Sequence, residues 1–378
     1  MPQSRSLVTP TSSPLLERAL RDKLQRRNER GGSLGELEPL AIRLGLMQNS
    51  LKPVLHDPQL LVFAADHGLA VDGITGGLTG GMTGGIPDPQ ARSTHETVQM
   101  LLSSQLPLTV FARAQQIEVT VVDCGVAQIL PPHERLMMRK IAYGTRNARA
   151  SAAMTLEQAH AGMRAGMEIG DKLPGNVTVL AGVGVGAHES ASLVLARLTD
   201  SAVHDLVVSG PHMDPEYLAH VMAVLGAAQH RHRDVVEPID VLAAFGGFEV
   251  AVMVGVILMA ASKRHLIMID GAPACAALML AARIAQPVTD YCVFCRSHGH
   301  RGLDQALNLF SASALLELGM ESTDGTGATL AWPLLRSAAA LLTDVADGED
   351  PGPSRPGKLI EPPFDVQPAA LPFGRAMY

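Results

Sequence analysis

The sequence predicts an α/β fold with a mostly parallel β-sheet. Short segments of strand type alternate with longer segments of helical type, and parallel strands require helical crossovers between them. The strand segments are almost wholly apolar, as expected for strands buried on both faces. Hydrophobic residues make up 47% of the chain and aromatic residues only 3%, so small aliphatic side chains must fill the core, which suits close packing of helices on a sheet.

Four segments have the composition of buried strands, and five have the length and apolar spacing of helices. The predicted strands are 60–66 (LLVFAAD), 119–125 (VTVVDCG), 176–184 (NVTVLAGVG) and 265–271 (HLIMIDG). The predicted helices are 155–172, 214–230, 240–261, 272–285 and 328–343.

Each predicted strand ends in Asp or Gly. Ligands of parallel α/β sheets bind beyond the carboxyl ends of the strands. We therefore expect a site along one edge of the sheet at Asp66-His67-Gly68, Asp123-Cys124-Gly125, Gly182-Val183-Gly184 and Asp270-Gly271. Asp and Gly also end strands without any functional role, so the pattern alone leaves both interpretations open.

Charge and composition exclude several classes of protein. The formal charge of −7 and a pI near 6.0 argue against a nucleic-acid-binding protein. Four cysteines in 378 residues do not form a disulfide framework, so we expect a cytoplasmic location. The N-terminal sequence lacks the apolar core of a signal peptide. The longest apolar stretch, 250–262, is shorter than the about 20 residues that cross a bilayer, so no membrane association is expected.

Three stretches could contact an anion. Residues 73–88 repeat Thr-Gly-Gly three times; their backbone could wrap an anion or form a lid, although a flexible surface insertion is the favoured interpretation. The stretch Gly182-Val183-Gly184-Val185-Gly186 resembles a phosphate-binding turn between strand and helix, but lacks the spacing of an NAD or ATP motif. The turn Gly144-Thr145-Arg146-Asn147 suits phosphate contact, although a solvated turn is the favoured interpretation when it is considered alone.

Cys292, Cys295, His298 and His300 are metal-ligating residue types at close spacing. They contain a single Cys-x-x-Cys inside an apolar segment, where free cysteines are commonly small buried residues, so a metal site is the less favoured interpretation. His300 and Arg301 could instead donate hydrogen bonds to a phosphate.

Residues 321–330 (ESTDGTGATL) place the acid Asp324 in a loop of small residues before a predicted helix. A carboxylate there could act as a general base. Asp is also a good N-cap residue, worth about 1 kcal/mol. The two roles are compatible only if the side chain faces a pocket.

Taken together, these stretches resemble one family, the nicotinate-nucleotide–dimethylbenzimidazole phosphoribosyltransferases, from about residue 30 to residue 345. The matching stretches are GSLGELEPLAIRL (32–44), VFAADHGLA (62–70), VVDCGVA (121–127), YGTRNARASAAMTLEQAHAGMRAG (143–166), DVLAAFGGFEVAVMVGVILMAA (240–261), IMIDGAPACAALML (267–280), GHRGLDQAL (299–307) and DGTGATLAWPLL (324–335).

The resemblance implies a Rossmann-like α/β domain with a smaller helical domain, usually in a homodimer. It also implies that nicotinate mononucleotide and 5,6-dimethylbenzimidazole react to give α-ribazole 5′-phosphate and nicotinate in cobalamin synthesis, without a metal or organic cofactor. The expected parts are a disordered N-terminus (1–13), a helical part of the small domain (14–55), a nucleotide-binding α/β domain (56–320), a site loop and helix returning to the small domain (321–345), and a Pro-rich tail (346–378).

The resemblance also implies site residues. Asp324 takes the position of the proposed base, where the family has a glutamate, so its carboxylate is withdrawn by about 1.5 Å, the length of one C–C bond. The base pocket is expected at Gln99, Ser322 and Thr75. The phosphoribosyl and nucleotide-binding residues are expected to be Asp66, His67, Gly68, Gly144, Thr145, Arg146, Asn147, Gly182, Gly184, Asp270, Ser297, His300 and Arg301.

Some positions depart from the family pattern. A second active-site glutamate of the family is replaced by Gly182, and a lysine by Val221. The loop before Gly299 is about three residues shorter than usual and the Thr-Gly-Gly run is extra, and each of these changes falls at the expected site rather than in the core. These departures leave an alternative open, in which the chain is a non-catalytic or altered-specificity paralogue that binds a nucleotide or base, possibly within a hetero-oligomer.

Overall fold

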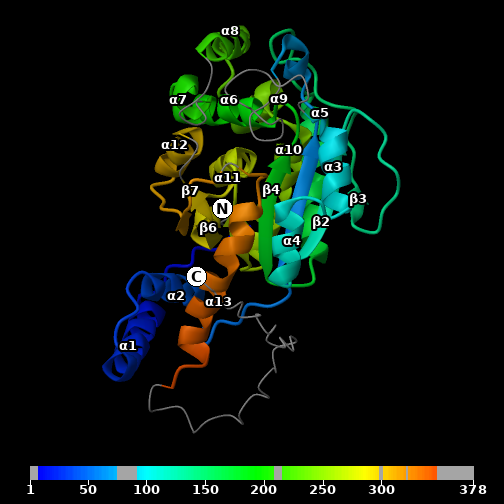
Figure 1. Cartoon of the computed structure of the whole chain (residues 1–378). Coiled ribbons are helices and arrows are strands. Elements are labelled where there is room, and N and C mark those ends of the chain that lie inside the picture. The colour runs from blue at the N-terminus through cyan, green and yellow to red at the C-terminus, as the bar shows by residue number, and fades with distance from the viewer. Residues whose placement is uncertain (1–6, 75–91, 208–214, 298–300, 321, 347–378) are drawn as a thin grey trace, which may run out of the picture.

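The computed structural model describes residues 7–74, 92–207, 215–297, 301–320 and 322–346 (Figure 1). The strands are β1 (Gln59–Ala65), β2 (Glu118–Gly125), β3 (Leu136–Met138), β4 (Val177–Val183), β5 (Leu266–Ile269), β6 (Cys292–Phe294), β7 (Arg296–Ser297) and β8 (Leu316–Glu317). The helices are α1 (Pro14–Gly31), α2 (Leu37–Gln48), α3 (Thr94–Leu102), α4 (Pro107–Ala114), α5 (Leu156–Lys172), α6 (Ala187–Thr199), α7 (Val203–Val207), α8 (Pro215–Arg231), α9 (Pro238–Phe245), α10 (Phe248–Ser262), α11 (Ala272–Ile284), α12 (Arg301–Leu309) and α13 (Thr326–Thr343), with 3-10 turns η1 (Gly68–Asp72) and η2 (Gln286–Tyr291).

The main sheet has six parallel strands in the order β3-β2-β1-β4-β5-β6. This confirms the predicted α/β class and gives the doubly wound order. The chain leaves the central strand β1 toward β2 and later returns to β4 on its other side. Because the strand order reverses there, the carboxyl ends of β1 and β4 flank a topological switch point, which is where such folds bind ligands.

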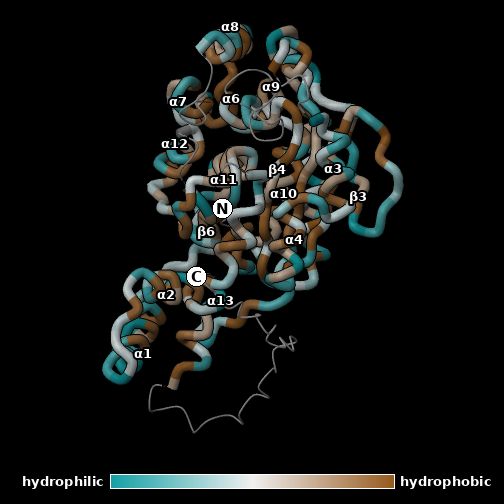
Figure 2. Tube along the Cα trace, in the orientation of Figure 1, coloured by the Kyte–Doolittle hydropathy of each residue, from teal (hydrophilic) through white to brown (hydrophobic). Residues whose placement is uncertain are grey.

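Helices cover both faces of the sheet because right-handed crossovers in opposite directions place them on opposite sides. Helix α10 lies against β1, β2, β4 and β5, and α5 packs on α10, while α3 and α4 contact the β1–β2 half. Figure 2 shows the central strands and α10 as mainly hydrophobic. Helix α10 is buried on nearly every side, as expected for a helix that is apolar around its whole circumference.

Two sequence-based predictions need correction. The helix predicted over 240–261 is two helices, α9 and α10, separated by Gly246 and Gly247 in extended backbone conformations. Part of the N-terminus predicted to be disordered packs on the body of the protein. Val8 is buried, the hydroxyl of Tyr291 donates to the Thr9 carbonyl at 2.7 Å, and the backbone N–H of Thr11 donates to Asp290 at 3.0 Å.

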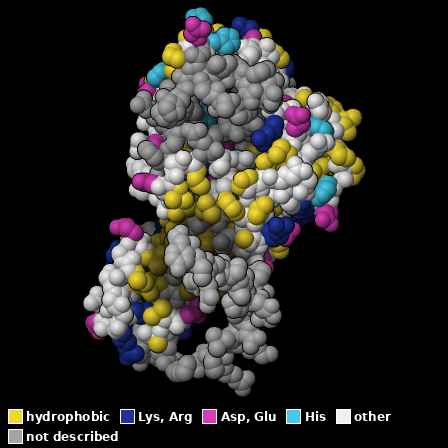
Figure 3. Space-filling model, in the orientation of Figure 1, with side chains coloured by type: hydrophobic (Ala, Val, Ile, Leu, Met, Phe, Trp, Pro, Cys, Tyr) yellow, Lys and Arg dark blue, Asp and Glu magenta, His cyan; other side chains and the backbone are white. Residues whose placement is uncertain are grey.

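Helices α1, α2 and α13 form a smaller helical part, which brings the first and last described helices side by side (Figure 1). Buried Arg27 links them, because its Nη1 donates to the Leu341 carbonyl at 2.7 Å. Several apolar side chains of α1, α13, the α1–α2 loop and the segment after α2 are exposed, and Figure 3 shows hydrophobic side chains on this part of the molecule. They are Leu15, Leu34, Leu51, Val54 and Leu334.

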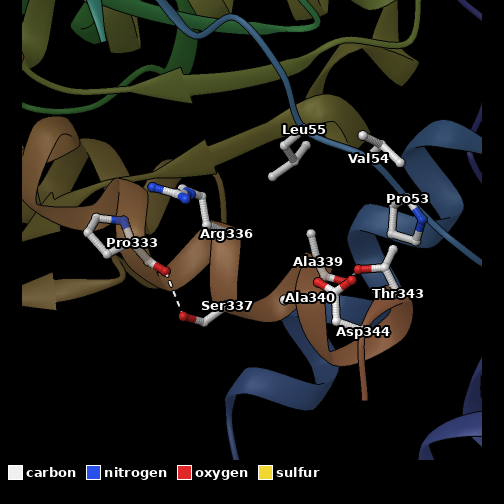
Figure 4. A pocket seen from close by; sticks show the side chains of 10 residues that line it. All are labelled: Pro53, Val54, Leu55, Pro333, Arg336, Ser337, Ala339, Ala340, Thr343 and Asp344. Carbon is white, nitrogen blue, oxygen red and sulfur yellow. Dashed lines mark hydrogen bonds between the residues drawn. The ribbon is translucent and has the colours of Figure 1, made fainter. Parts of the chain in front are cut away.

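A cavity of about 560 Å³ lies between α13 and the segment that leads into β1 (Figure 4). Pro53, Val54 and Leu55 line one side of it, and Arg336 and Ser337 line the other. The lining segment 53–55 precedes β1, so this cavity is at the amino ends of the strands, away from the switch point. None of the predicted site residues lines it. No helix in the described ranges is long and apolar enough to cross a membrane.

Candidate functional site

The turns after β1 and β4 meet at the switch point. The His67 N–H donates to the Val185 carbonyl at 3.2 Å. Gly184 approaches β1 so closely that a Cβ there would lie 1.8 Å from the Ala65 carbonyl oxygen. A glycine is therefore required at position 184 for this contact. The structure thus brings together two of the strand ends predicted to form the site.

Asp66 connects these turns to the surrounding loops. One carboxylate oxygen accepts a hydrogen bond from the Thr94 hydroxyl, and the other accepts from the Ala127 N–H at 2.7 Å. The Thr94 oxygen in turn accepts from the Val185 N–H at 3.0 Å. Both oxygens of Asp66 have protein partners, so this carboxylate fixes the shape of the switch-point loops.

The residues of the predicted polar turn 144–147 lie in different regions of the structure. The Thr145 N–H donates to the Asp66 carbonyl at 3.0 Å, and its hydroxyl accepts from the Gly68 N–H at 3.1 Å, so Gly144 and Thr145 join the switch point. Arg146 instead donates to the Ala152 carbonyl and lines a separate cavity of about 530 Å³.

Beyond that turn, the Asn147 amide donates to Asp72 at 2.6 Å. Asp72 also pairs with Arg149 at 2.5 Å, and its carbonyl accepts from His220 at 2.6 Å. Asn147 therefore belongs to a separate network around η1.

A buried ionisable group lies behind the switch point. His67 Nε2 is 3.1 Å from Glu249 Oε1, and both side chains are almost completely enclosed. The atoms are misaligned for a hydrogen bond, and neither oxygen of Glu249 has a hydrogen-bond partner among the described residues. Burial, the largest single effect, lowers the pKa of His67, but Glu249 together with the charges of Asp66 and Glu189 outweighs it, so the pKa is raised. Glu189, in the first turn of α6, is a second buried acid nearby.

A second cluster forms just beyond the carboxyl ends of β5 and β6. Arg296 Nε donates to Asp270 Oδ1 at 2.6 Å, and Arg296 Nη2 donates to Asp324 Oδ1 at 2.7 Å. The other oxygen of Asp270 accepts from the Ala328 N–H, at the start of α13, at 3.0 Å. The structure thus brings the predicted base Asp324 and the predicted strand-end residue Asp270 to one guanidinium.

The cluster changes the acidity of Asp324. Burial, with a further contribution from the charge of Asp270, raises the pKa of Asp324 to about 7, while Arg296 opposes the rise. The two carboxylates raise the pKa of Arg296 above its usual range, so the guanidinium stays charged. A carboxyl group whose pKa is close to neutral suits proton transfer at physiological pH. Only 8% of the Asp324 side chain is exposed, so access to it is restricted.

Close packing at Gly271 holds Asp324 in place. Gly271 has φ +102°, and a Cβ there would lie 2.0 Å from Asp324 Oδ2. Glycine is therefore needed both for the backbone conformation and for the approach of the carboxylate. The strand-end Asp-Gly that the sequence marked as a candidate is thus in direct contact with Asp324.

The other predicted residues are more scattered. Gln99 is exposed on α3, and the hydroxyl of Ser322 is buried without a hydrogen-bond partner among the described residues. Ser297 belongs to β7 and Arg301 begins α12. Thr75 and His300 lie outside the described residues, as do most of the Thr-Gly-Gly stretch and His298. Val221 is buried in α8.

The metal alternative finds no support in the described residues, where no group of three or more His, Cys, Asp or Glu could hold an ion. Cys292 and Cys295 are buried. Burial raises the pKa of Cys292 to about 12 and that of Cys295 well above its usual range, so neither thiol ionises readily to the thiolate that zinc would bind.

Gly182 is inside β4, where a Cβ would lie 2.6 Å from the Pro273 Cβ. We expect Gly182→Glu to lower the free energy of unfolding by several kcal/mol, because it overpacks the core and buries an unpaired charge. Gly226→Glu is the matched control, since a Cβ at Gly226 meets nothing within 4 Å. Chemical denaturation measures both; equal stability of the two variants would contradict the packing seen at Gly182.

Sequence reasoning missed Arg296, Glu249 and Glu189. Arg296 follows an apolar strand, the same signal that marked Asp270, but by residue type only the neighbouring Cys and His residues and Arg301 were considered as candidate ligands in this stretch. The pairing of Glu249 with His67 joins residues far apart in sequence, and no local pattern predicts it.

Comparison with known proteins places the chain among enzymes. A family model described as Phosphoribosyltransferase matches residues 9–352. The nicotinate-nucleotide–dimethylbenzimidazole phosphoribosyltransferase of Cupriavidus taiwanensis is 40% identical over 336 residues, which cover 88% of this chain and 92% of the relative. The chain belongs to this phosphoribosyltransferase family.

Two further members support the assignment. The enzyme of the same name from Variovorax paradoxus is 38% identical over 336 residues, covering 89% of this chain and 93% of the relative. The crystal structure of the phosphoribosyltransferase from Thermus thermophilus superimposes with a TM-score of 0.78 at 28% identity, covering 88% of this chain and 96% of that one. The fold and family expected from the sequence are therefore confirmed.

Proposed function

We propose that this member of the phosphoribosyltransferase family transfers the phosphoribosyl group of nicotinate mononucleotide to 5,6-dimethylbenzimidazole or a related base. The products are α-ribazole 5′-phosphate and nicotinate, for cobalamin nucleotide-loop assembly. The observation that carries the proposal is the buried Asp324, held by Arg296 at the carboxyl edge of the sheet, in a chain with full-length similarity to these enzymes.

The reaction explains why a carboxylate is needed. One ring nitrogen of the base attacks C1′ of the ribose, and the C1′–N bond to nicotinate breaks with its electron pair returning to the pyridine ring. The pyridinium leaves without acid catalysis. The other ring nitrogen of the base must lose its proton as positive charge develops, and Asp324 accepts that proton and later passes it to water. Holding both rings on opposite faces of C1′ supplies much of the acceleration and dictates inversion.

The switch point suits the phosphoribosyl group. Helix α6 begins directly after the Gly184–Gly186 turn, and the amino end of a helix favours an anion through its unpaired N–H groups and its dipole. Gly68 and Thr145, which are joined by a hydrogen bond, belong to the loops that meet this turn at the switch point. These groups support a phosphate at the switch point, with Asp324 serving the base from the neighbouring strand ends.

The direct test mixes the purified protein with nicotinate mononucleotide and a panel of benzimidazoles and measures nicotinate release by chromatography. We expect release that depends on the added base, with one α-ribazole 5′-phosphate formed per nicotinate. Tight binding of either substrate without release by any base, at high protein concentration, would instead favour a non-catalytic paralogue.

We propose that the protein works as a homodimer in the cytoplasm, as the family resemblance implies. The exposed Leu15, Leu51 and Leu334 of the small helical part support a surface that is covered in the assembly. Analytical ultracentrifugation should give twice the chain mass of 39.9 kDa. A monomer at micromolar concentration would contradict the dimer.

A further inference from the structure

All three nitrogens of the Arg296 guanidinium have partners. Nε and Nη2 bind Asp270 and Asp324, and Nη1 donates to the Met320 carbonyl at 3.0 Å. The side chain is 2% exposed. A planar guanidinium bound through every nitrogen has a fixed position and orientation.

The partners of Arg296 come from separate parts of the chain. Asp270 directly follows β5 and is itself tied to the first turn of α13 through the Ala328 N–H. Met320 and Asp324 flank the loop that leads into α13. Arg296 therefore joins the edge of the sheet to the loop that carries the proposed base, and a loop residue needs such a tie to be held accurately.

The contact uses one oxygen of Asp324. Oδ1 accepts from Arg296, whereas Oδ2 lies against Gly271 and is the oxygen left for a proton from a substrate.

Charged groups of several elements surround the cluster. Asp270 and Arg296 face Asp324 directly, Cys275 of α11 is close by, and His188 of α6 lies within electrostatic range of Arg296. Burial lowers the pKa of His188, which leaves Arg296 as the cation that offsets Asp270.

We propose that Arg296 is a positioning residue for the transfer reaction, which holds Oδ1 of Asp324, presents Oδ2 to the N–H of the base, and favours the ionised form of this carboxylate. The inference rests on the proposed function. It explains how a side chain one methylene shorter than glutamate serves as the base, because Arg296 fixes a carboxylate that would otherwise rotate or stay protonated in this enclosed place.

Two substitutions separate the effects of charge and geometry. Arg296→Met removes both, and we expect kcat to fall about 10-fold or more while the acid limb of the pH–rate profile moves up by about one unit or more. Arg296→Lys keeps the charge but loses the planar fork. We expect it to retain an acid limb near that of the unchanged protein and to lower kcat by about 10-fold, with KM for nicotinate mononucleotide changed much less than kcat in both variants.

Arg27→Met is the matched control. Arg27 is equally buried but donates to the Leu341 carbonyl in the small helical part. We expect this variant to lose stability without a shift in the pH profile. If Arg296→Met does not fold, Arg296→Lys still decides the question of geometry, because wild-type kcat in that variant would overturn the positioning role.

A second readout does not depend on turnover. In protein with ¹³C-labelled Asp carboxyl groups, NMR should show one resonance that titrates near neutral pH and disappears in Asp324→Asn. We expect Arg296→Met to move this titration upward and Arg27→Met to leave it in place. If the wild-type protein releases nicotinate while Arg296→Met changes neither the titration of Asp324 nor the acid limb of the pH–rate profile, the positioning role of Arg296 is overturned and the proposed function still stands. Wild-type protein that releases no nicotinate would remove the proposed function, and the positioning role with it.

Discussion

Asp324→Asn should lower kcat/KM for nicotinate release by about 10²- to 10⁴-fold, the usual contribution of a positioned general base. The amide keeps the size of the side chain and cannot accept the proton of the base. Asp344→Asn, at the exposed far end of the same helix, is the control and should keep full activity. Wild-type rates for Asp324→Asn in a stably folded protein would show that another group accepts the proton.

The pH dependence follows from the same carboxyl group. Its pKa is raised from 3.8 to about 7 in the folded protein, so activity should rise with pH and level off above neutrality as the base ionises. The free energy of unfolding changes with pH in the direction opposite to the activity. Between pH 4 and about 7 the folded state binds this proton more tightly than the unfolded state, so the contribution of Asp324 to the free energy of unfolding falls as pH rises. Asp324→Asn should remove both dependences.

His67→Gln should lower the free energy of unfolding by about 3–5 kcal/mol, because it leaves the buried Glu249 charge without its cation. Chemical denaturation at pH 6, below the unfolded pKa of histidine, measures the loss. Glu249→Gln should be destabilising for the reciprocal reason. The double variant replaces both charges and should be more stable than the sum of the single losses predicts. Strictly additive losses would show that the 3.1 Å contact carries no coupling energy.

The sign of the pH effect at His67 is the ordinary one for histidine. Its folded-state pKa is raised by Glu249, so the contribution of the protonated ring is fully present below the unfolded value near 6.5 and is lost as pH rises through the folded value. His67→Gln should therefore lose more stability at pH 6 than at a pH above the folded-state pKa of His67.

The sequence predicted the fold well where the signal is local and strong. The four strands expected near 60–66, 119–125, 176–184 and 265–271 correspond to β1, β2, β4 and β5. The short strands β3 and β6 have three residues each, too few for an alternating or continuous apolar pattern to stand out. The two helices merged over 240–261 are both apolar, and only the Gly246-Gly247 pair marks the break.

The site residues were also predicted only where a local sequence signal marks them. The strand-end rule placed Asp66, His67 and Asp270 on one edge because parallel strands align their carboxyl ends. That rule cannot tell which side chains meet. The structure assigns Asp66 to loop-shaping hydrogen bonds and gives Asp324 an arginine partner 28 residues away, a pairing that depends on how α13 packs against the sheet.

The most direct test of the account is a crystal structure of the protein with 5,6-dimethylbenzimidazole bound. We expect one oxygen of Asp324 to lie within about 3.2 Å of a ring nitrogen of the base, with the other still bound to Arg296 and the second ring nitrogen facing the switch point. A base bound elsewhere, or bound here with both Asp324 oxygens turned toward protein groups, would contradict the role of Asp324 as the proton acceptor.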